Sequence, residues 1–216
     1  KAGANFNIPN RAGQTPAHIA AKFGSEATIQ AMLAAETEFN TIDATGVAPA
    51  HIVTLLQKTD VIHLMAEHYV NFDAIDHSCN TPVIEAVNSE NPQLIAAVAA
   101  TGVDFNAHCD RHGWTASTLA TASQKPEVIK AVARAGADFR SPDCGGNTPA
   151  HICSHFDGVN VARAVYQAGG DFNAPDAHGI TPAQRLVAGG NAKATEVLSE
   201  LGMDAEYISK VNLPKE

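Results

Sequence analysis

The chain has 216 residues, a hydrophobic content of 45% and a net charge of −9, from 23 acidic residues against 14 Lys and Arg. This acidic balance disfavours a nucleic-acid partner, because binding to a phosphate backbone uses clustered positive charge. No stretch approaches the roughly 18–20 apolar residues that cross a bilayer, so we expect no membrane span.

Three sequence features recur with one shared period. The first is a phenylalanine, at Phe6, Phe39, Phe72, Phe105, Phe139 and Phe172. The second is Thr-Pro or a related dipeptide, at residues 15–16, 48–49, 81–82, 115–116, 148–149 and 181–182. The third is an Asn or Asp that precedes a glycine by three residues, with Cys79 as the one exception to the glycine. A period of 33 or 34 residues in all three features is typical of stacked structural repeats.

Each repeat predicts a turn, two short helices and an extended return. In the first repeat, residues 10–13 have the composition of a turn, and Thr15-Pro16 is typical of a helix start. This helix is expected to end at Gly24, and Ser25 is expected to begin the second helix. Equivalent starts of the second helix are Asn91-Pro92, Pro126 and Asn191, and its expected ends are Gly102, Gly136, Gly169 and Gly202.

The order of these elements, with Thr-Pro-Ala-His-Ile at residues 15–19 and 148–152, resembles the ankyrin repeat and its Thr-Pro-Leu-His signature. The resemblance covers nearly the whole chain. It implies an all-α ankyrin-repeat solenoid of stacked helix-turn-helix units joined by β-hairpin-like fingers. The chain departs from the family pattern where Ile84, Thr118 and Gln184 replace the motif His, and where one extra residue lies near His108.

We expect a single ankyrin-repeat domain over residues 1–216. Its repeats span about 9–41, 42–74, 75–108, 109–141, 142–174 and 175–207. Residues 1–8 are interpreted as the tail of a preceding repeat, and residues 208–216 as a C-terminal cap. We therefore expect the chain to be part of a longer protein.

The histidines and cysteines are interpreted mainly as structural residues. The resemblance implies that His18, His51 and His151 hydrogen-bond to local backbone and to the Thr hydroxyl. We expect His63 and His68 on a solvated helix face, and Cys153 as a small core residue. The sequence lacks the phosphate-loop, nucleophile-elbow and zinc-protease motifs, so we expect no catalytic residue and no cofactor.

One set of residues leaves an alternative open. Potential zinc ligands fall in successive fingers, at His77, Cys79, His108, Cys109, His112, Cys144 and His178. Neighbouring repeats lie about 10 Å apart, and no Cys-x-x-Cys pair is present, so we favour exposed polar residues without metal. A zinc site and a Cys109–Cys144 disulfide remain as alternatives.

The function predicted is a non-catalytic scaffold that binds a protein on its concave finger and inner-helix face. Trp114, the single tryptophan, is the strongest contact candidate, because Trp and Arg are enriched at interface hot spots. The other candidates are Arg111, His112, Phe156, His77, Asn80, Asn147 and Ile180. We expect a monomer in the cytoplasm. The alternatives are the targeting module of a larger enzyme, such as a bacterial effector in host cytoplasm, and a Cys/His metal-binding protein.

Overall fold

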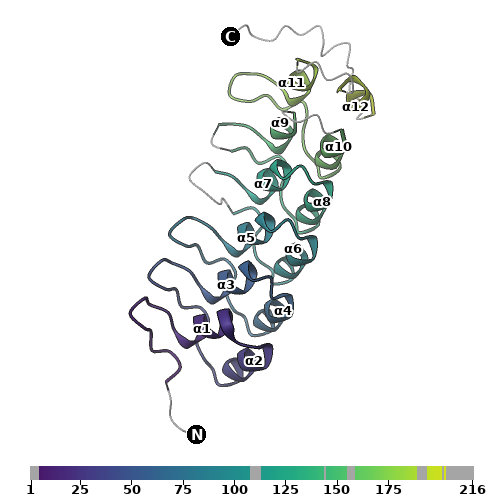
Figure 1. Ribbon diagram of the computed structural model, residues 1–216. Helices are drawn as coiled ribbons and strands as arrows, with labels where there is room; N and C mark the ends of the chain where they lie inside the picture. Colours follow the sequence, from purple (N-terminus) through teal and green to yellow (C-terminus); the bar gives the residue numbers. More distant parts are fainter. Residues whose placement is uncertain are drawn as a thin grey trace. The chain divides into compact units, whose positions relative to one another are not determined.

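The computed structural model describes residues 5–107, 113–143, 145–154, 159–188, 194–200 and 202, with the backbone alone at 194–196. The chain forms two compact units, unit 1 (Lys1–Asp104) and unit 2 (Phe105–Glu216). The described residues contain paired α-helices and no β-strand, which confirms the all-α prediction (Figure 1). That the whole chain is one domain with the repeat bounds given above stays a prediction.

Unit 1 consists of three helix pairs. These are α1 (Pro16–Phe23) with α2 (Glu26–Ala34), α3 (Pro49–Leu55) with α4 (Thr59–Glu67), and α5 (Pro82–Asn88) with α6 (Pro92–Ala99). We call the first helix of each pair, which lies beside the fingers in Figure 1, the inner helix, and the second the outer helix. Inner helix α3 packs against α1 and α5, and outer helix α4 packs against α2 and α6.

Unit 2 repeats this arrangement. Its pairs are α7 (Ala116–Ala122) with α8 (Pro126–Arg134), α9 (Pro149–Cys153) with α10 (Val159–Gln167), and α11 (Pro182–Ala188) with α12 (Ala194–Glu200). Inner helix α9 packs against α7 and α11, and outer helix α10 packs against α8 and α12. The buried sides of these helices are lined by small residues such as Ala116, Ala150 and Ala183, which lets short helices approach closely.

The helix starts follow local hydrogen-bonding chemistry. Helix α1 begins at Pro16 and ends at Phe23, before Gly24, as the sequence predicts. The side chain of Ser25 accepts the backbone N–H of Thr28 at 3.2 Å and so begins α2. The predicted starts at Asn91-Pro92 and Pro126 are also confirmed, whereas Asn191 lies outside the described residues.

The ends of the outer helices differ between repeats. The predicted glycines have left-handed backbone conformations, with φ of +81° at Gly102 and +95° at Gly169. In the first two repeats the equivalent residues are Glu36 and Tyr69, both with φ of +57°. A side chain in this conformation costs free energy, because its Cβ crowds the backbone. These two repeats therefore carry strain that the glycines avoid.

The return segments after the outer helices are joined by a repeated hydrogen bond. The Asn7 side-chain oxygen accepts the Glu38 backbone N–H at 3.0 Å. The Asn40 oxygen accepts the Asn71 N–H at 2.7 Å in the same way. One polar side chain per repeat thus fixes each return segment to the next.

Candidate partner-binding surface

The C-terminal ends of the inner helices in unit 1 carry large apolar side chains in contact with solvent. Phe23, the last residue of α1, is 75% exposed. Leu55, the last residue of α3, is 64% exposed, and the next residue, Leu56, is 45% exposed. Burial of one such side chain contributes about 1.5–3 kcal/mol, so a partner that covered them would gain free energy.

Helical spacing extends these ends into stripes. Ile19 lies four residues before Phe23, and Ile52 lies four before Leu56, so each pair shares one helix face. Ile19 is exposed and Ile52 is half-buried. Because α1 and α3 pack side by side, their stripes adjoin. We call Ile19, Phe23, Ile52, Leu55 and Leu56 the apolar surface of unit 1.

A hollow of about 660 Å³ adjoins the α1 end of this surface. Ile19 and Phe23 line it together with Ile8, Pro9, Ala20 and Met32, and Asn10, Gln14, Pro16, Gly24 and Thr28 complete its wall. Its volume lies within the range of sites that hold apolar ligand groups. The hollow belongs to the first repeat alone, since no residue of α3 or α4 lines it.

The third inner helix of unit 1 is acidic at the corresponding position. Glu85 of α5 stands where α1 has Ile19 and α3 has Ile52. Burial raises the pKa of the Glu85 carboxyl, and the negative charge of Asp76 raises it further. Within the described residues Glu85 has no ion-pair partner. The apolar surface is therefore bordered by two carboxyl groups that repel each other.

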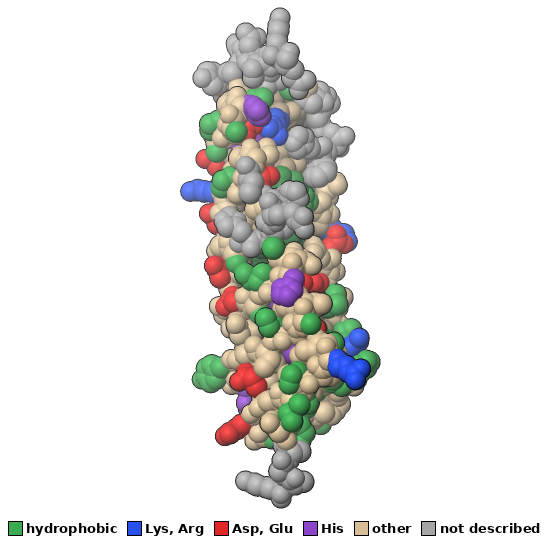
Figure 2. All heavy atoms as spheres, turned by 90° about the vertical axis from the view of Figure 1, so that its left-hand side faces the viewer, with side chains coloured by type: hydrophobic (Ala, Val, Ile, Leu, Met, Phe, Trp, Pro, Cys, Tyr) green, Lys and Arg blue, Asp and Glu red, His purple; other side chains and the backbone are tan. Residues whose placement is uncertain are grey.

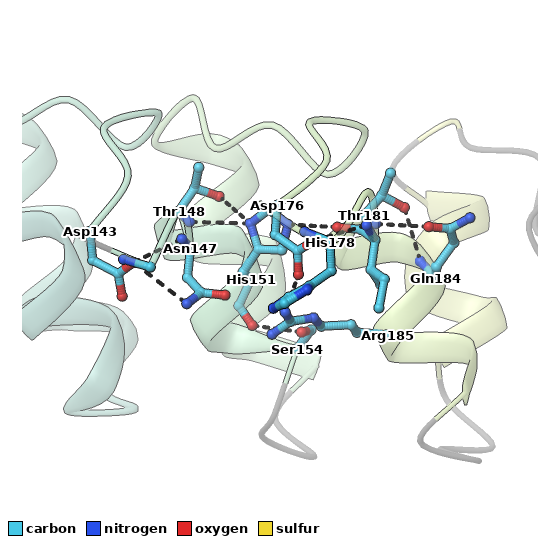
Figure 3. A network of polar contacts seen from close by, with 12 residues as sticks. Asp143, Asn147, Thr148, His151, Ser154, Asp176, His178, Thr181, Gln184 and Arg185 are labelled. Carbon is cyan, nitrogen blue, oxygen red and sulfur yellow. Dashed lines mark hydrogen bonds and ion pairs between the residues drawn. The ribbon is translucent and has the colours of Figure 1, made fainter. Parts of the chain in front are cut away.

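Repeat 6 places a cation at this same position. Arg185 of α11 forms an ion pair with Asp176, the equivalent of Asp76, and Figure 3 shows the two side chains pointing toward each other. The side chain of Asp176 is 1% exposed. Burial alone would raise its pKa, but the N–H groups of Ile180 and His178 together with Arg185 hold the pKa below its ordinary value. Here the buried carboxylate is neutralised within the chain.

The finger turns are built by the Asp that begins each repeat. The Asp43 Oδ1 accepts the backbone N–H of Thr45 at 2.8 Å and of Val47 at 3.1 Å. Gly46 then closes the turn with φ of +80°. A Cβ at Gly46 would lie 2.8 Å from the backbone N of His77 in the next finger. Cys79 replaces this glycine in the third finger and is exposed with φ of +63°.

The motif histidines join consecutive repeats. The Thr148 backbone N–H donates to His151 Nδ1 at 3.1 Å, and the Thr148 hydroxyl lies 2.9 Å from the same nitrogen. Nδ1 is therefore an acceptor, which leaves the proton on Nε2. Nε2 donates to the carbonyl oxygen of Ile180, in the next repeat, at 3.0 Å (Figure 3). The expected bonds to Thr and to local backbone are present.

The same arrangement recurs at His18, whereas His51 lacks the expected hydroxyl contact because Ala48 stands where the other two repeats have Thr. His18 Nε2 lies 3.0 Å from the Val47 carbonyl oxygen, and His51 Nε2 lies 3.2 Å from that of Asn80. The sequence did not reveal these bonds between repeats. Burial lowers the pKa of both His51 and His151, which favours the neutral imidazole that this geometry requires. These histidines stabilise the stack and are not available as general bases.

The predicted contact residues are placed as follows. Trp114 is half-buried, and Asn80, Asn147 and Ile180 are half-buried at the same position of their repeats. The Asn80 side-chain amide donates to Asp76 Oδ2 at 3.4 Å, which turns it toward its own finger. His77 is exposed. Arg111, His112 and Phe156 lie outside the described residues.

The sequence-based search missed Phe23, Leu55, Leu56 and Glu85, although comparison of equivalent inner-helix positions would have revealed them.

The remaining histidines and cysteines divide into three groups. His63 and His68 are exposed, and Cys153 is fully buried, where burial raises the pKa of its thiol. His77, Cys79 and His178 are exposed, and no group of three or more potential metal ligands occurs in the described part of the chain. His108, Cys109, His112 and Cys144 lie outside it. That the fingers bind no metal stays a prediction.

Charge is unevenly divided between the units. Unit 1 contains 11 acidic residues and 4 Lys and Arg, and unit 2 contains 12 and 10, so their net charges are −7 and −2. On the described part of the face in Figure 2, acidic and hydrophobic side chains are interspersed, and Lys and Arg form no continuous patch. The described part of this face thus shows no basic stripe of the kind that nucleic-acid-binding proteins carry.

Comparison with known protein families gives one match. A family model described as ankyrin repeats (3 copies) matches residues 83–176. The search of curated protein sequences found no significant match. None of the helices among the described residues has both the length and the apolar character to cross a membrane.

Solved structures with a similar fold are ankyrin repeat domains. The domain of Bcl-3, named as a unique member of the IkappaB protein family, has a TM-score of 0.79 at 19% identity and covers 89% of this chain and 88% of its own. Human ASB11 has a TM-score of 0.71 at 19% identity, with coverage of 91% and 87%. A domain from Acinetobacter baumannii AYE has a TM-score of 0.76 at 21% identity, with coverage of 88% and 98%.

These matches define the fold as that of the ankyrin repeat, which is generally a non-catalytic module for protein–protein interaction. Residues 83–176 are therefore ankyrin repeats, and the chain as a whole has the fold of an ankyrin repeat domain.

Proposed function

We propose that this chain is a non-catalytic scaffold that binds a protein partner on its fingers and inner helices, with the apolar surface of unit 1 as the main contact. One observation carries the proposal. Of the ten large hydrophobic side chains that are exposed in the described residues, nine belong to unit 1, and four of these nine lie in the apolar surface, namely Ile19, Phe23, Leu55 and Leu56. Clustered exposed apolar side chains on a rigid frame mark sites of protein contact.

Trp114 is proposed as a second contact, in unit 2. Its half-buried state leaves part of the ring accessible, and tryptophan supplies a large contact area. We also retain Arg111, His112, Phe156, His77, Asn80, Asn147 and Ile180 as proposed contacts. A monomeric, cytoplasmic protein and a role as the targeting module of a larger enzyme are compatible with the same binding activity and stay predictions.

A selection from random peptides displayed on phage tests the proposal. The full chain is expected to enrich binding sequences that a Leu55→Ser/Leu56→Ser variant no longer retains. Tyr69→Ser is the matched control, because Tyr69 is 92% exposed but lies at the end of outer helix α4.

Trp114→Ala is expected to weaken binding by about 2 kcal/mol or more, which is roughly thirtyfold. Binders that the double variant and Trp114→Ala retain unchanged would contradict the proposed surface.

A further inference from the structure

The third repeat contains a carboxyl pair at the positions where the sixth repeat contains an ion pair. Asp76 and Glu85 are nine residues apart, as are Asp176 and Arg185, and both pairs join the first residue of a repeat to its inner helix. In repeat 6 the guanidinium of Arg185 neutralises Asp176. In repeat 3 no described Lys or Arg pairs with Glu85, and the Asp76 Oδ2 accepts only the Asn80 amide at 3.4 Å. A cation from outside would occupy the place of Arg185.

This carboxyl pair lies at one end of the apolar surface. Ile19, Ile52 and Glu85 occupy the same position of three inner helices that pack in the order α1, α3, α5. The other end carries the opposite charge, since the Lys22 amine lies 5.3 Å from the centre of the Phe23 ring. The two ends of the surface therefore differ in charge. A cation lies over α1, apolar side chains cover α1 and α3, and carboxyl groups lie at α5.

We propose that this surface binds an amphipathic helix of a partner protein, with an Arg or Lys of the helix between Asp76 and Glu85 and its apolar residues on α1 and α3. The inference rests on the proposed protein-binding function. The net charge of −7 on unit 1 favours a basic partner and disfavours an anionic membrane or a second copy of this chain.

Helix geometry sets the length of the partner segment. Neighbouring packed helices lie about 8–10 Å apart, so the distance from α5 to α1 is about 16–20 Å. At about 1.5 Å per residue, a helix of roughly 12 residues spans this distance. The basic residue of the partner is then about two turns from its first apolar anchor, which lies on α3, and a second anchor lies on α1 against Ile19.

The raised pKa of Glu85 supports the same conclusion. Its carboxylate is destabilised by burial and by Asp76, and the attraction of a bound guanidinium or ammonium group would offset both effects. Binding of the basic helix is therefore expected to weaken as the pH falls and Glu85 becomes protonated. The salt dependence of binding is expected to be steep, since the interaction is partly between charges.

The test uses two synthetic peptides of about 14 residues that form amphipathic helices with identical leucine faces. One carries Arg at the predicted position, and the other carries Glu there. Fluorescence anisotropy measures their binding to the full chain, to Glu85→Arg and to Glu67→Arg. Glu67 is exposed on outer helix α4, so its substitution changes the net charge equally but away from the surface. Glu85→Arg is expected to fold, because repeat 6 already holds Arg at this position.

The Arg peptide is expected to lose about tenfold or more in affinity for Glu85→Arg, and less than about threefold for Glu67→Arg. The Glu peptide is expected to show the reverse preference and to bind Glu85→Arg better than the wild-type chain. Equal effects of the two substitutions, or no saturable binding of the Arg peptide to the wild-type chain, would overturn the inference. If the phage selection enriches sequences that depend on Leu55 and Leu56 but lack Lys and Arg, the proposed function stands and this inference fails.

Discussion

Residues 1–104 and 105–216 use the same repeat, but at equivalent positions their side chains differ in kind. At the inner-helix position of Arg185, repeats 1, 2, 4 and 5 have Ile19, Ile52, Leu119 and Ile152, whereas repeat 3 of unit 1 has Glu85 and repeat 6 of unit 2 has Arg185 bonded to Asp176. Unit 1 also carries five of the six non-glycine residues with positive φ found in the described chain. Repeat 3 thus leaves a negative charge uncompensated that repeat 6 neutralises, and most of the strained backbone in the described chain lies in unit 1. These features are the cost in stability that we expect if the surface binds the partner proposed above.

The largest difference is expected from removal of the internal ion pair. Arg185→Leu leaves the Asp176 carboxylate buried without its cation and should destabilise unit 2 by about 2 to 3 kcal/mol. Hydrogen exchange measured by mass spectrometry on peptides from each unit should place this loss in the last repeats. Arg134→Leu, at an exposed position of α8, is the control and should cost less than about 0.5 kcal/mol. Equal losses in the two variants would show that the pair does not stabilise the unit.

A second loss is expected from the histidines that join repeats. His151→Ala leaves the buried Thr148 N–H without its acceptor and the Ile180 carbonyl without its donor, which should cost about 2 kcal/mol. Urea denaturation measures this change in the free energy of unfolding. His63→Ala, at an exposed position of α4, should change stability by less than about 0.5 kcal/mol. A small effect at His151 would mean that water replaces both bonds.

Acidification should act on the same bonds in both units. The pKa values of folded His51 and His151 lie below the ordinary 6.5 because burial disfavours the charged ring. The folded state therefore binds fewer protons, so their contribution to stability is complete above about pH 6.5 and is lost as pH falls below it. The loss should be smaller than for His151→Ala, since the ring stays in place. The melting temperatures of the wild-type chain and of a His51→Gln/His151→Gln variant should converge as the pH is lowered from 7.5 to 5.

Introducing into repeat 3 of unit 1 the ion pair that repeat 6 of unit 2 contains should increase the stability of unit 1. Glu85→Arg replaces the repulsion between Glu85 and Asp76 with an ion pair like that of repeat 6. We expect a gain of up to about 1 kcal/mol in the free energy of unfolding, modest because both groups are partly exposed. The gain should decrease at high salt. Urea denaturation at low and high salt measures it, and a loss of stability would mean that repeat 3 cannot form the pair.

The smallest effects are expected from the strained backbone. Tyr69→Gly should stabilise unit 1 by about 0.5–1 kcal/mol, because glycine adopts φ of +57° without crowding. The reverse change, Gly169→Ala in unit 2, should cost about 1 kcal/mol, since a Cβ there meets no atom within 4 Å and only the backbone conformation opposes it. Melting temperatures of the two variants should move in opposite directions.

The sequence alone determined the repeat and the helix starts, and the family resemblance implied the local role of the motif histidines. These features depend on hydrogen bonds between residues up to four apart, such as Thr148 with His151, and such bonds have the same chemistry in every repeat. The outer-helix ends were predicted only where glycine marks them. Glu36 and Tyr69 adopt the same left-handed backbone without a sequence signal, because tertiary packing overrides their local preference.

The candidate surface was decided by the tertiary structure. The bond from His151 to the Ile180 carbonyl joins residues 29 apart, and the exposure of Phe23, Leu55 and Leu56 depends on how α1 and α3 pack. An apolar residue at the end of an amphipathic helix has the same sequence signal whether a neighbour covers it or not. Only the stacked arrangement determines which side chains remain uncovered, because burial depends on contacts between residues about one repeat apart.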